Sequence, residues 1–308
     1  GGGSPIAKAD VTLWVTTGGG PRKLAQTRTA DDGSFQLSTT GKNDIASVLY
    51  LTSEGGIAKA AASTKINPAI TMMATLGTKP LPHVTINELT TVASAWTGAQ
   101  FLNGSSLSGN ALGLRIAAGN VPNLVDLDTG GWGPVIVNPL NGPQTSTLAK
   151  FNTLANILSA CIVAKAGACN KLFEAATPPG AVAPTDTLSA AQNIARHPWH
   201  NADKIFGLLN EFYPVPAGKR YREVAFIPYL YFAPSAWTLS LVYSGGGFYG
   251  VGGAAIDSEG NFWSNNNWLV GSQTTIYQQF GGGNGKFAPD GTPLSPMITG
   301  YRGGGIDS

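Results

Sequence analysis

The hydrophobic pattern of this chain changes its period twice, and this change limits the available folds more than any other feature. Residues 1–80 alternate apolar and polar positions, as half-buried strands do. Residues 81–213 place apolar residues at helical spacing, and residues 214–308 return to short apolar runs separated by Gly and Pro. Strands and helices that are segregated in this way argue against a parallel α/β sheet. The sequence therefore predicts a multidomain β + α protein with three domains, 1–80, 81–213 and 214–308.

The first region predicts a small β-sandwich. The segment DVTLWV places Val11, Leu13 and Val15 on one face of a strand. The segment KLAQTRTADDGSFQLST predicts a hairpin around its Asp-Asp-Gly turn, and ASVLYLTSEGG predicts a further strand. Several short strands joined by closely spaced turns are typical of a sandwich.

The second region predicts a small helical bundle. Thr85 and Glu88 have the spacing of a capping box, and Leu89, Val92 and Trp96 follow on one helical face. Further helices are expected near 108–118 and in the segments TSTLAKFNTLANILSACIVA, TDTLSAAQNIARH and NADKIFGLLNEF.

Cys161 and Cys169 are the two cysteines of the chain, and they flank a Gly-containing turn between two periodic apolar runs. This spacing favours a disulfide that joins a helical hairpin, with two buried free thiols as the alternative. We expect no metal at this place, because no His or second cysteine pair lies near it in the sequence.

The third region predicts strands in WTLSLVYSGGG, AAIDSEGNFWSNN, TTIYQQF and GKFAPDGTPLSP. Its first part is rich in aromatic residues and has three interpretations: an exposed interface, a sugar-binding surface, or a linker packed on both sides. The residues concerned are Tyr221, Phe226, Tyr229, Tyr231, Phe232 and Trp237.

Three groups of segments resemble modules of secreted bacterial proteins. GGGSPIAKADVTLW followed by TRTADDGSFQL resembles Ig-like or carboxypeptidase-regulatory-like domains. VTINELTTVASAW, LANILSAC, ATPPG and PTDTLSAAQNIARHP resemble a helical module known mainly from Acidobacteria, which is commonly followed by a propeller of the NHL or streptogramin-lyase-like type. AAIDSEGNFWSNN resembles the first blade of such a propeller, and TGYRGGGIDS resembles the lead-in to the next one.

The resemblance implies an Ig-like β-sandwich, a central helical bundle and an incomplete propeller-type β-blade in a secreted or cell-surface bacterial protein. It implies no established reaction for this family. Streptogramin lyases use His and Glu on the central face of the propeller, whereas the three histidines here, His83, His197 and His200, lie outside the blade. We therefore assign no catalytic residue, metal ligand or cofactor.

The low charge content suits a secreted protein or one whose surface is partly covered by neighbours, and it suits a turn-rich β protein without such contacts equally well. Only 12% of the residues are charged, about half the usual fraction, and the scattered Lys and Arg do not indicate a nucleic-acid partner. No apolar run is long enough for a membrane span. Both ends of the sequence read as those of a fragment of a longer polypeptide.

The expected function is that of a non-catalytic extracellular structural or adhesion protein that associates with itself or with other surface proteins. The segment around Val11, Leu13 and Val15 is a candidate donor strand for polymeric assembly. The alternatives are a propeller enzyme whose active site lies beyond Ser308 and a carbohydrate-binding module.

Overall fold

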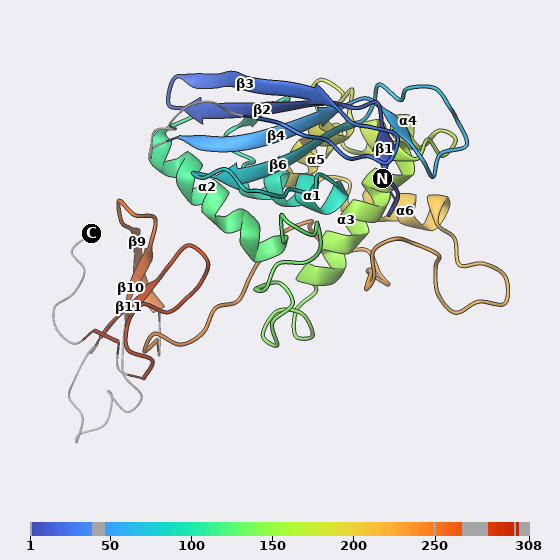
Figure 1. Ribbon diagram of the computed structural model, residues 1–308. Helices are drawn as coiled ribbons and strands as arrows, with labels where there is room; N and C mark the ends of the chain where they lie inside the picture. Colours follow the sequence, from blue (N-terminus) through green and yellow to red (C-terminus); the bar gives the residue numbers. More distant parts are fainter. Residues whose placement is uncertain (1, 39–46, 249–250, 267–282, 299, 302–308) are drawn as a thin grey trace. The chain divides into compact units, whose positions relative to one another are not determined.

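A four-stranded antiparallel sheet forms from the alternating segments near the start of the chain. The computed structural model describes residues 2–38, 47–248, 251–266, 283–298 and 300–301. The strand order is β3-β2-β4-β6 (Figure 1), and a short β1 (Ile6–Ala7) pairs with β5 (Ile57–Ala58) beside it. The four strands are β2 (Asp10–Thr17), β3 (Gly20–Arg28), β4 (Val48–Glu54) and β6 (Thr71–Gly77).

Six helices and a short hairpin follow within the same compact unit, which extends to Leu241. Helices α1, α2 and α5 contact β6, and α3 packs against α1, α4, α5 and α6. The helices are α1 (Glu88–Thr97), α2 (Ala111–Leu124), α3 (Thr147–Ile162), α4 (Ala168–Ala175), α5 (Thr187–Arg196) and α6 (Ala202–Phe212), and the hairpin strands are β7 (Leu102–Asn103) and β8 (Ser106–Leu107).

The sheet and the helices share one hydrophobic core, and this differs from the predicted boundaries at residues 80 and 213. Tyr50 of β4, Val92 of α1 and Leu154 of α3 belong to one continuous cluster of buried side chains. The structure divides the chain once, between Leu241 and Val242. The change of period marks where secondary structure changes, but it cannot show which elements bury their apolar faces against one another.

The β2 strand lies at the centre of the sheet. Val11, Leu13 and Val15 lie in this strand, which pairs with β3 on one side and with β4 on the other. Both edges of the predicted donor strand are thus occupied by the chain's own strands, so it cannot donate to a neighbour in this state. We therefore correct that assignment.

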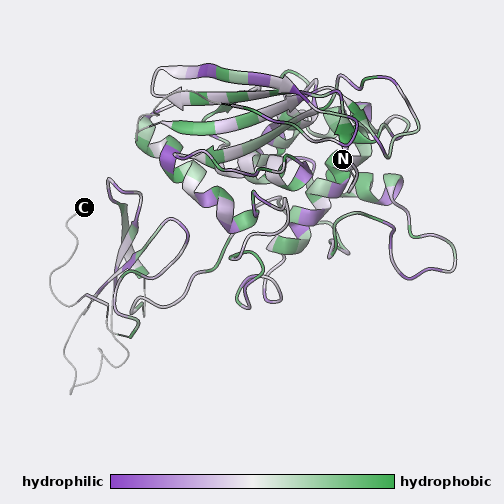
Figure 2. Cartoon of the chain, in the orientation of Figure 1, coloured by the Kyte–Doolittle hydropathy of each residue, from purple (hydrophilic) through white to green (hydrophobic). Residues whose placement is uncertain are grey.

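Both outer edges of the sheet are protected. On β6, the amide N–H groups of Met73 and Thr75 donate to the hydroxyls of Thr91 and Ser94 of α1, over 3.1 and 3.0 Å. On the opposite edge, β3 begins GPRK and ends in Arg, and it is visibly more hydrophilic than β4 (Figure 2). Proline and cationic side chains are common means of preventing edge-to-edge pairing.

Two local predictions differ from the structure. The hairpin closes at Gly18-Gly19, between β2 and β3, whereas the Asp-Asp-Gly segment forms a turn from Ala30 to Ser34 that no strand follows in residues 34–38. Helix α1 is capped by Asn87 and Thr90 rather than by Thr85 and Glu88. Both segments offer hydrogen-bonding side chains at neighbouring positions, so spacing alone does not select the right register.

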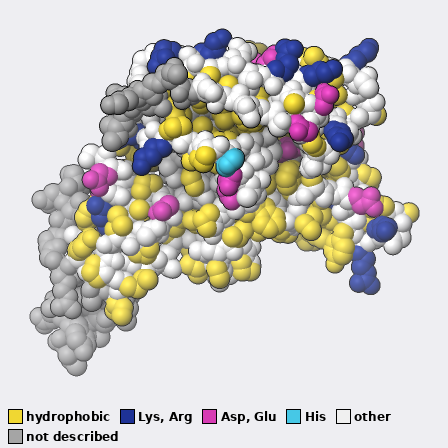
Figure 3. Space-filling model, viewed as in Figure 1, with side chains coloured by type: hydrophobic (Ala, Val, Ile, Leu, Met, Phe, Trp, Pro, Cys, Tyr) yellow, Lys and Arg dark blue, Asp and Glu magenta, His cyan; other side chains and the backbone are white. Residues whose placement is uncertain are grey.

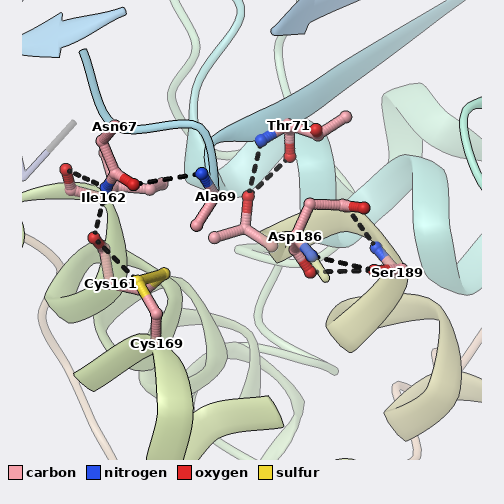
Figure 4. The surroundings of a disulfide bond; sticks show 9 residues. Asn67, Ala69, Thr71, Cys161, Ile162, Cys169, Asp186 and Ser189 are labelled. Carbon is pink, nitrogen blue, oxygen red and sulfur yellow. Dashed lines mark hydrogen bonds between the residues drawn. A yellow bond between two sulfur atoms is a disulfide. The ribbon is translucent and has the colours of Figure 1, made fainter. Parts of the chain in front are cut away.

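The predicted disulfide between Cys161 and Cys169 is confirmed, and it joins the end of α3 to α4. Around it, the Asn67 side chain donates to the carbonyl oxygen of Cys161 over 2.9 Å and accepts from the amide of Ala69 (Figure 4). The loop that precedes β6 is thereby tied to the C-terminal end of α3.

The second unit contains a three-stranded antiparallel sheet of order β11-β10-β9. Its strands are β9 (Val251–Ile256), β10 (Phe262–Asn266) and β11 (Asn284–Phe287). The predicted AAIDSEGNFWSNN hairpin corresponds to β9 and β10. The predicted strand in WTLSLVYSGGG is irregular instead, and TTIYQQF lies outside the described residues.

Candidate functional site

The segment from Pro214 to Leu241 has no helix or strand, yet its backbone is held at many points. Its main fixation is to α3. The amide of Leu230 donates to the hydroxyl of Thr153 over 2.9 Å, and the carbonyl oxygen of Pro228 accepts from the side chain of Asn152 over 2.9 Å. The hydroxyl of Thr147 donates to the carbonyl oxygen of Ser240 over 2.6 Å. We call residues 214–241 the strap.

Polar side chains inside α3 make this attachment specific. Asn152, Thr153 and Asn156 are fully buried. A buried amide or hydroxyl is costly unless it is hydrogen-bonded, so these side chains require the strap as their partner. Sequence reasoning missed this arrangement, although the signal was present as Asn and Thr residues between the apolar residues of α3.

The two ends of the strap are anchored separately. Near its start, the guanidinium of Arg222 donates to the carbonyl oxygen of Tyr213 and to the side chain of Asn210. Near its end, Trp237 is fully buried in the core, and its carbonyl oxygen accepts from the indole of Trp96 over 2.7 Å. We therefore correct the assignment of Trp237 to an aromatic surface, since it is a core anchor.

The outer side of the strap presents large apolar side chains. Tyr221, Tyr231 and Phe232 are exposed, as is Ile227 between them, with exposed fractions from 59% for Ile227 to 81% for Phe232. Tyr231 stacks on the half-buried Tyr229 with ring centroids 6.3 Å apart, and Phe232 lies 6.2 Å from Tyr231. Hydrophobic side chains also gather over this face of the molecule in Figure 3. We call Tyr221, Ile227, Tyr231 and Phe232 the aromatic surface.

Phe226, the remaining predicted member, is half-buried and packs against the core. The six residues predicted together thus separate into two groups. Tyr221, Tyr231 and Phe232 face outward, whereas Phe226, Tyr229 and Trp237 hold the strap to the core. The two groups arise because the strap is irregular and packs only one of its sides against α3.

Among the described residues, no group of three or more His, Cys, Asp or Glu side chains could hold a metal ion. His197 ends α5, and the Nε2 atom of His200 lies 2.9 Å from the carbonyl oxygen of Thr177, so the HPWH segment serves as a turn between helices. In the described part of the chain, no helix has the length and hydrophobicity to span a membrane.

Comparisons with protein-family models, with curated proteins and with solved structures found no match.

Proposed function

We propose that this chain is a non-catalytic extracellular structural protein that associates with copies of itself through the aromatic surface of the strap. The observation that carries the proposal is the exposure of Tyr221, Ile227, Tyr231 and Phe232 on a backbone that α3 already fixes. Contiguous exposed apolar surface on a soluble protein usually marks an interaction site. Aromatic side chains are also the residues most enriched at such sites.

Because the backbone of the strap is fixed, its exposed aromatic side chains are better suited to binding a partner than those of a flexible loop would be. Association costs less when the contacting side chains are already ordered, because little conformational entropy is then lost. The hydrogen bonds from Asn152, Thr153 and Asn156 provide this order. The protected edges of the sheet, in contrast, make strand addition at β3 or β6 a poor route to assembly.

Two further observations support an extracellular location. A disulfide joins Cys161 to Cys169, and disulfides persist mainly in oxidising compartments. The resemblance of the sequence to Ig-like, helical and propeller modules of secreted bacterial proteins points the same way. We choose a second copy as the partner because the aromatic surface consists of large apolar side chains, and interfaces between identical chains are more apolar than other protein interfaces.

Analytical ultracentrifugation over a wide range of protein concentration tests the proposal. We expect the wild-type chain to form oligomers and the double variant Tyr231→Ser, Phe232→Ser to remain monomeric. Val182→Ser is the matched control, because Val182 is 89% exposed and lies outside the strap. A wild-type chain that stays monomeric at about 1 mM, or a double variant that associates as the wild type does, would contradict the proposal.

Carbohydrate binding is a second candidate, favoured by the row of rings formed by Tyr229, Tyr231 and Phe232. It predicts glycan binding that Tyr231→Ala abolishes without changing the oligomeric state. Trp237 takes no part in this candidate, because its ring is buried.

A further inference from the structure

A cavity of about 1110 Å³ lies on the face of the sheet that includes Val11, Leu13 and Leu51. These three side chains form a small buried cluster. The volume of the cavity slightly exceeds the range of roughly 300–1,000 Å³ that is usual for small-molecule pockets. The cavity belongs to the first unit and does not involve the exposed residues of the aromatic surface.

Two irregular segments wall this cavity. Phe35 and Leu37 come from the segment after the Ala30–Ser34 turn, and Val84 and Ile86 come from the segment that leads into α1. All four pack against the cluster but remain partly exposed. They therefore retain apolar surface that a ligand in the cavity would remove from water.

Within the part of the chain that the structure describes, the first wall also presents main-chain groups that no other segment pairs with. No hydrogen bond between described residues involves the backbone N–H or C=O groups of residues 35–38. Each of these residues has an N–H group, whereas the second wall contains Pro82, which has none. An extended chain beside residues 35–38 could exchange main-chain hydrogen bonds with them, as strands do at an open edge.

The charge at the cavity is negative. Asp32, Glu88 and Asp128 line it, and no Lys or Arg occurs among the described residues of its lining. Glu88 accepts from the amide of Gly2 over 2.6 Å, while Asp32 and Asp128 are exposed at the rim. A cationic group at the end of a bound ligand would meet these two carboxylates.

We propose that this cavity binds an extended, basic peptide segment of a partner protein, which pairs with residues 35–38 and places apolar side chains against the two walls. The free main-chain groups call for a polypeptide rather than a lipid or a sugar, and the carboxylates call for Lys or Arg in it. This site is separate from the aromatic surface, so the proposal does not depend on the association proposed above.

Titration of the full chain with the blocked peptide Lys-Val-Thr-Val-Thr-Val-Thr-Lys, followed by NMR, tests this inference. We expect saturable shifts at residues 34–38 and 81–86. A peptide with N-methyl groups at alternate amides keeps its side chains and charge but loses main-chain donors, and should bind at least about tenfold more weakly. A peptide with Glu in place of both Lys residues should also bind more weakly.

Two variants locate the site on the protein. Gln36→Pro removes a donor from the first wall, and Asp128→Lys reverses a charge at the rim. Both residues are exposed, so the fold should tolerate them. Glu223→Lys is the control, because it makes the same charge change on an exposed carboxylate outside the lining.

Several results would overturn the inference. One is the absence of peptide binding at about 1 mM. Another is an N-methylated peptide that binds the wild-type chain as tightly as the unmodified peptide does. The third is Gln36→Pro and Asp128→Lys variants that bind the unmodified peptide as tightly as the wild-type chain does. If Gln36→Pro instead changed the sedimentation of the protein without peptide, a second copy of this chain would be the occupant, and the proposal would also fail.

Discussion

The side-chain amide of Asn156 forms both hydrogen bonds that a neighbouring strand would form with Phe226. Its Nδ2 atom donates to the carbonyl oxygen of Phe226 over 2.7 Å, and its Oδ1 atom accepts from the amide of Phe226 over 3.1 Å. One buried side chain thus provides a partner for both the N–H and the C=O group of a residue in an irregular segment. The position of the aromatic surface depends on this pair.

Replacement of Asn156 by Leu should release the middle of the strap. The variant keeps a side chain of similar size but leaves the Phe226 N–H and C=O groups without their partner, at a cost of about 2–4 kcal/mol in the free energy of unfolding. Urea denaturation measures the loss, and hydrogen exchange should become faster at residues 222–232. Asn170→Leu is the control, since Asn170 is exposed on α4 and the change there should stay within about 0.5 kcal/mol. Equal stability of both variants would show that the pair does not hold the strap.

Thr187 performs a similar role at the edge of the sheet. Its hydroxyl donates to the carbonyl oxygen of Thr71, which is labelled in Figure 4, over 2.6 Å and accepts from the amide of Thr71 over 3.1 Å. Thr187→Val should cost about 1–3 kcal/mol, because it preserves the shape but removes the hydroxyl. Thr187→Ser should retain most of the stability. If denaturation curves of the two variants coincide, the hydroxyl does not stabilise this edge.

Removal of the disulfide should destabilise the first unit without changing its fold. The bond spans a sequence separation of 8 residues, and the chain-entropy model gives about 2–3 kcal/mol for a loop of this length. The double variant Cys161→Ala, Cys169→Ala should show this loss in urea, and a reducing agent should then have no further effect. Wild-type protein that unfolds at the same urea concentration with and without reductant would contradict the prediction.

Asp257 should make the stability of the second unit depend on acid pH. Burial disfavours its ionised form, but hydrogen bonds from the Trp263 indole, from Asn261 and from Lys286 outweigh burial and hold the pKa of Asp257 well below its ordinary value. Because the folded pKa is lower than the unfolded pKa of about 3.9, this stabilisation is fully present above about pH 4 and is lost as the pH falls further.

Hydrogen exchange at the β10 amides between pH 3 and pH 6 measures this effect. The wild-type β9–β10 hairpin should open more readily toward the acid end, whereas Asp257→Asn should be less stable at pH 6 and less dependent on pH. Asp290→Asn, in another turn of the same unit, is the control, since among the described residues the Asp290 carboxylate accepts only from the amide of Thr292. A wild-type hairpin with constant protection over this range would contradict the assignment.

The sequence predicted local features better than their assembly. The apolar period of the segment TSTLAKFNTLANILSACIVA predicted α3, and Leu148, Phe151 and Leu158 of this helix are buried. The disulfide followed from two cysteines on either side of a turn. The shared core of the sheet and helices could not be predicted, because period gives the direction in which a residue faces but not the element that it meets.

The candidate site was predicted in composition but not in geometry. The aromatic run was visible in the sequence, yet the difference between exposed Phe232 and buried Trp237 depends on contacts with α3 and α1 that are distant in sequence. The cavity could not be predicted either, because Phe35 and Val84 meet only after the strands between them have paired. Buried polar residues such as Asn152 and Asn156 were the one sequence signal that an additional segment covers α3.

The strap also connects the two units, since it ends at Leu241 and the second unit begins at Val242. Tension applied to the second unit would therefore pass along the strap into the first. The force would first reach the hydrogen bond between Thr147 and Ser240 and then the buried ring of Trp237. After these it would reach the hydrogen bonds that hold Leu230, Pro228 and Phe226 to α3. For a chain that carries load between neighbours, this series of attachments is a mechanical anchor that resists extraction of the linker.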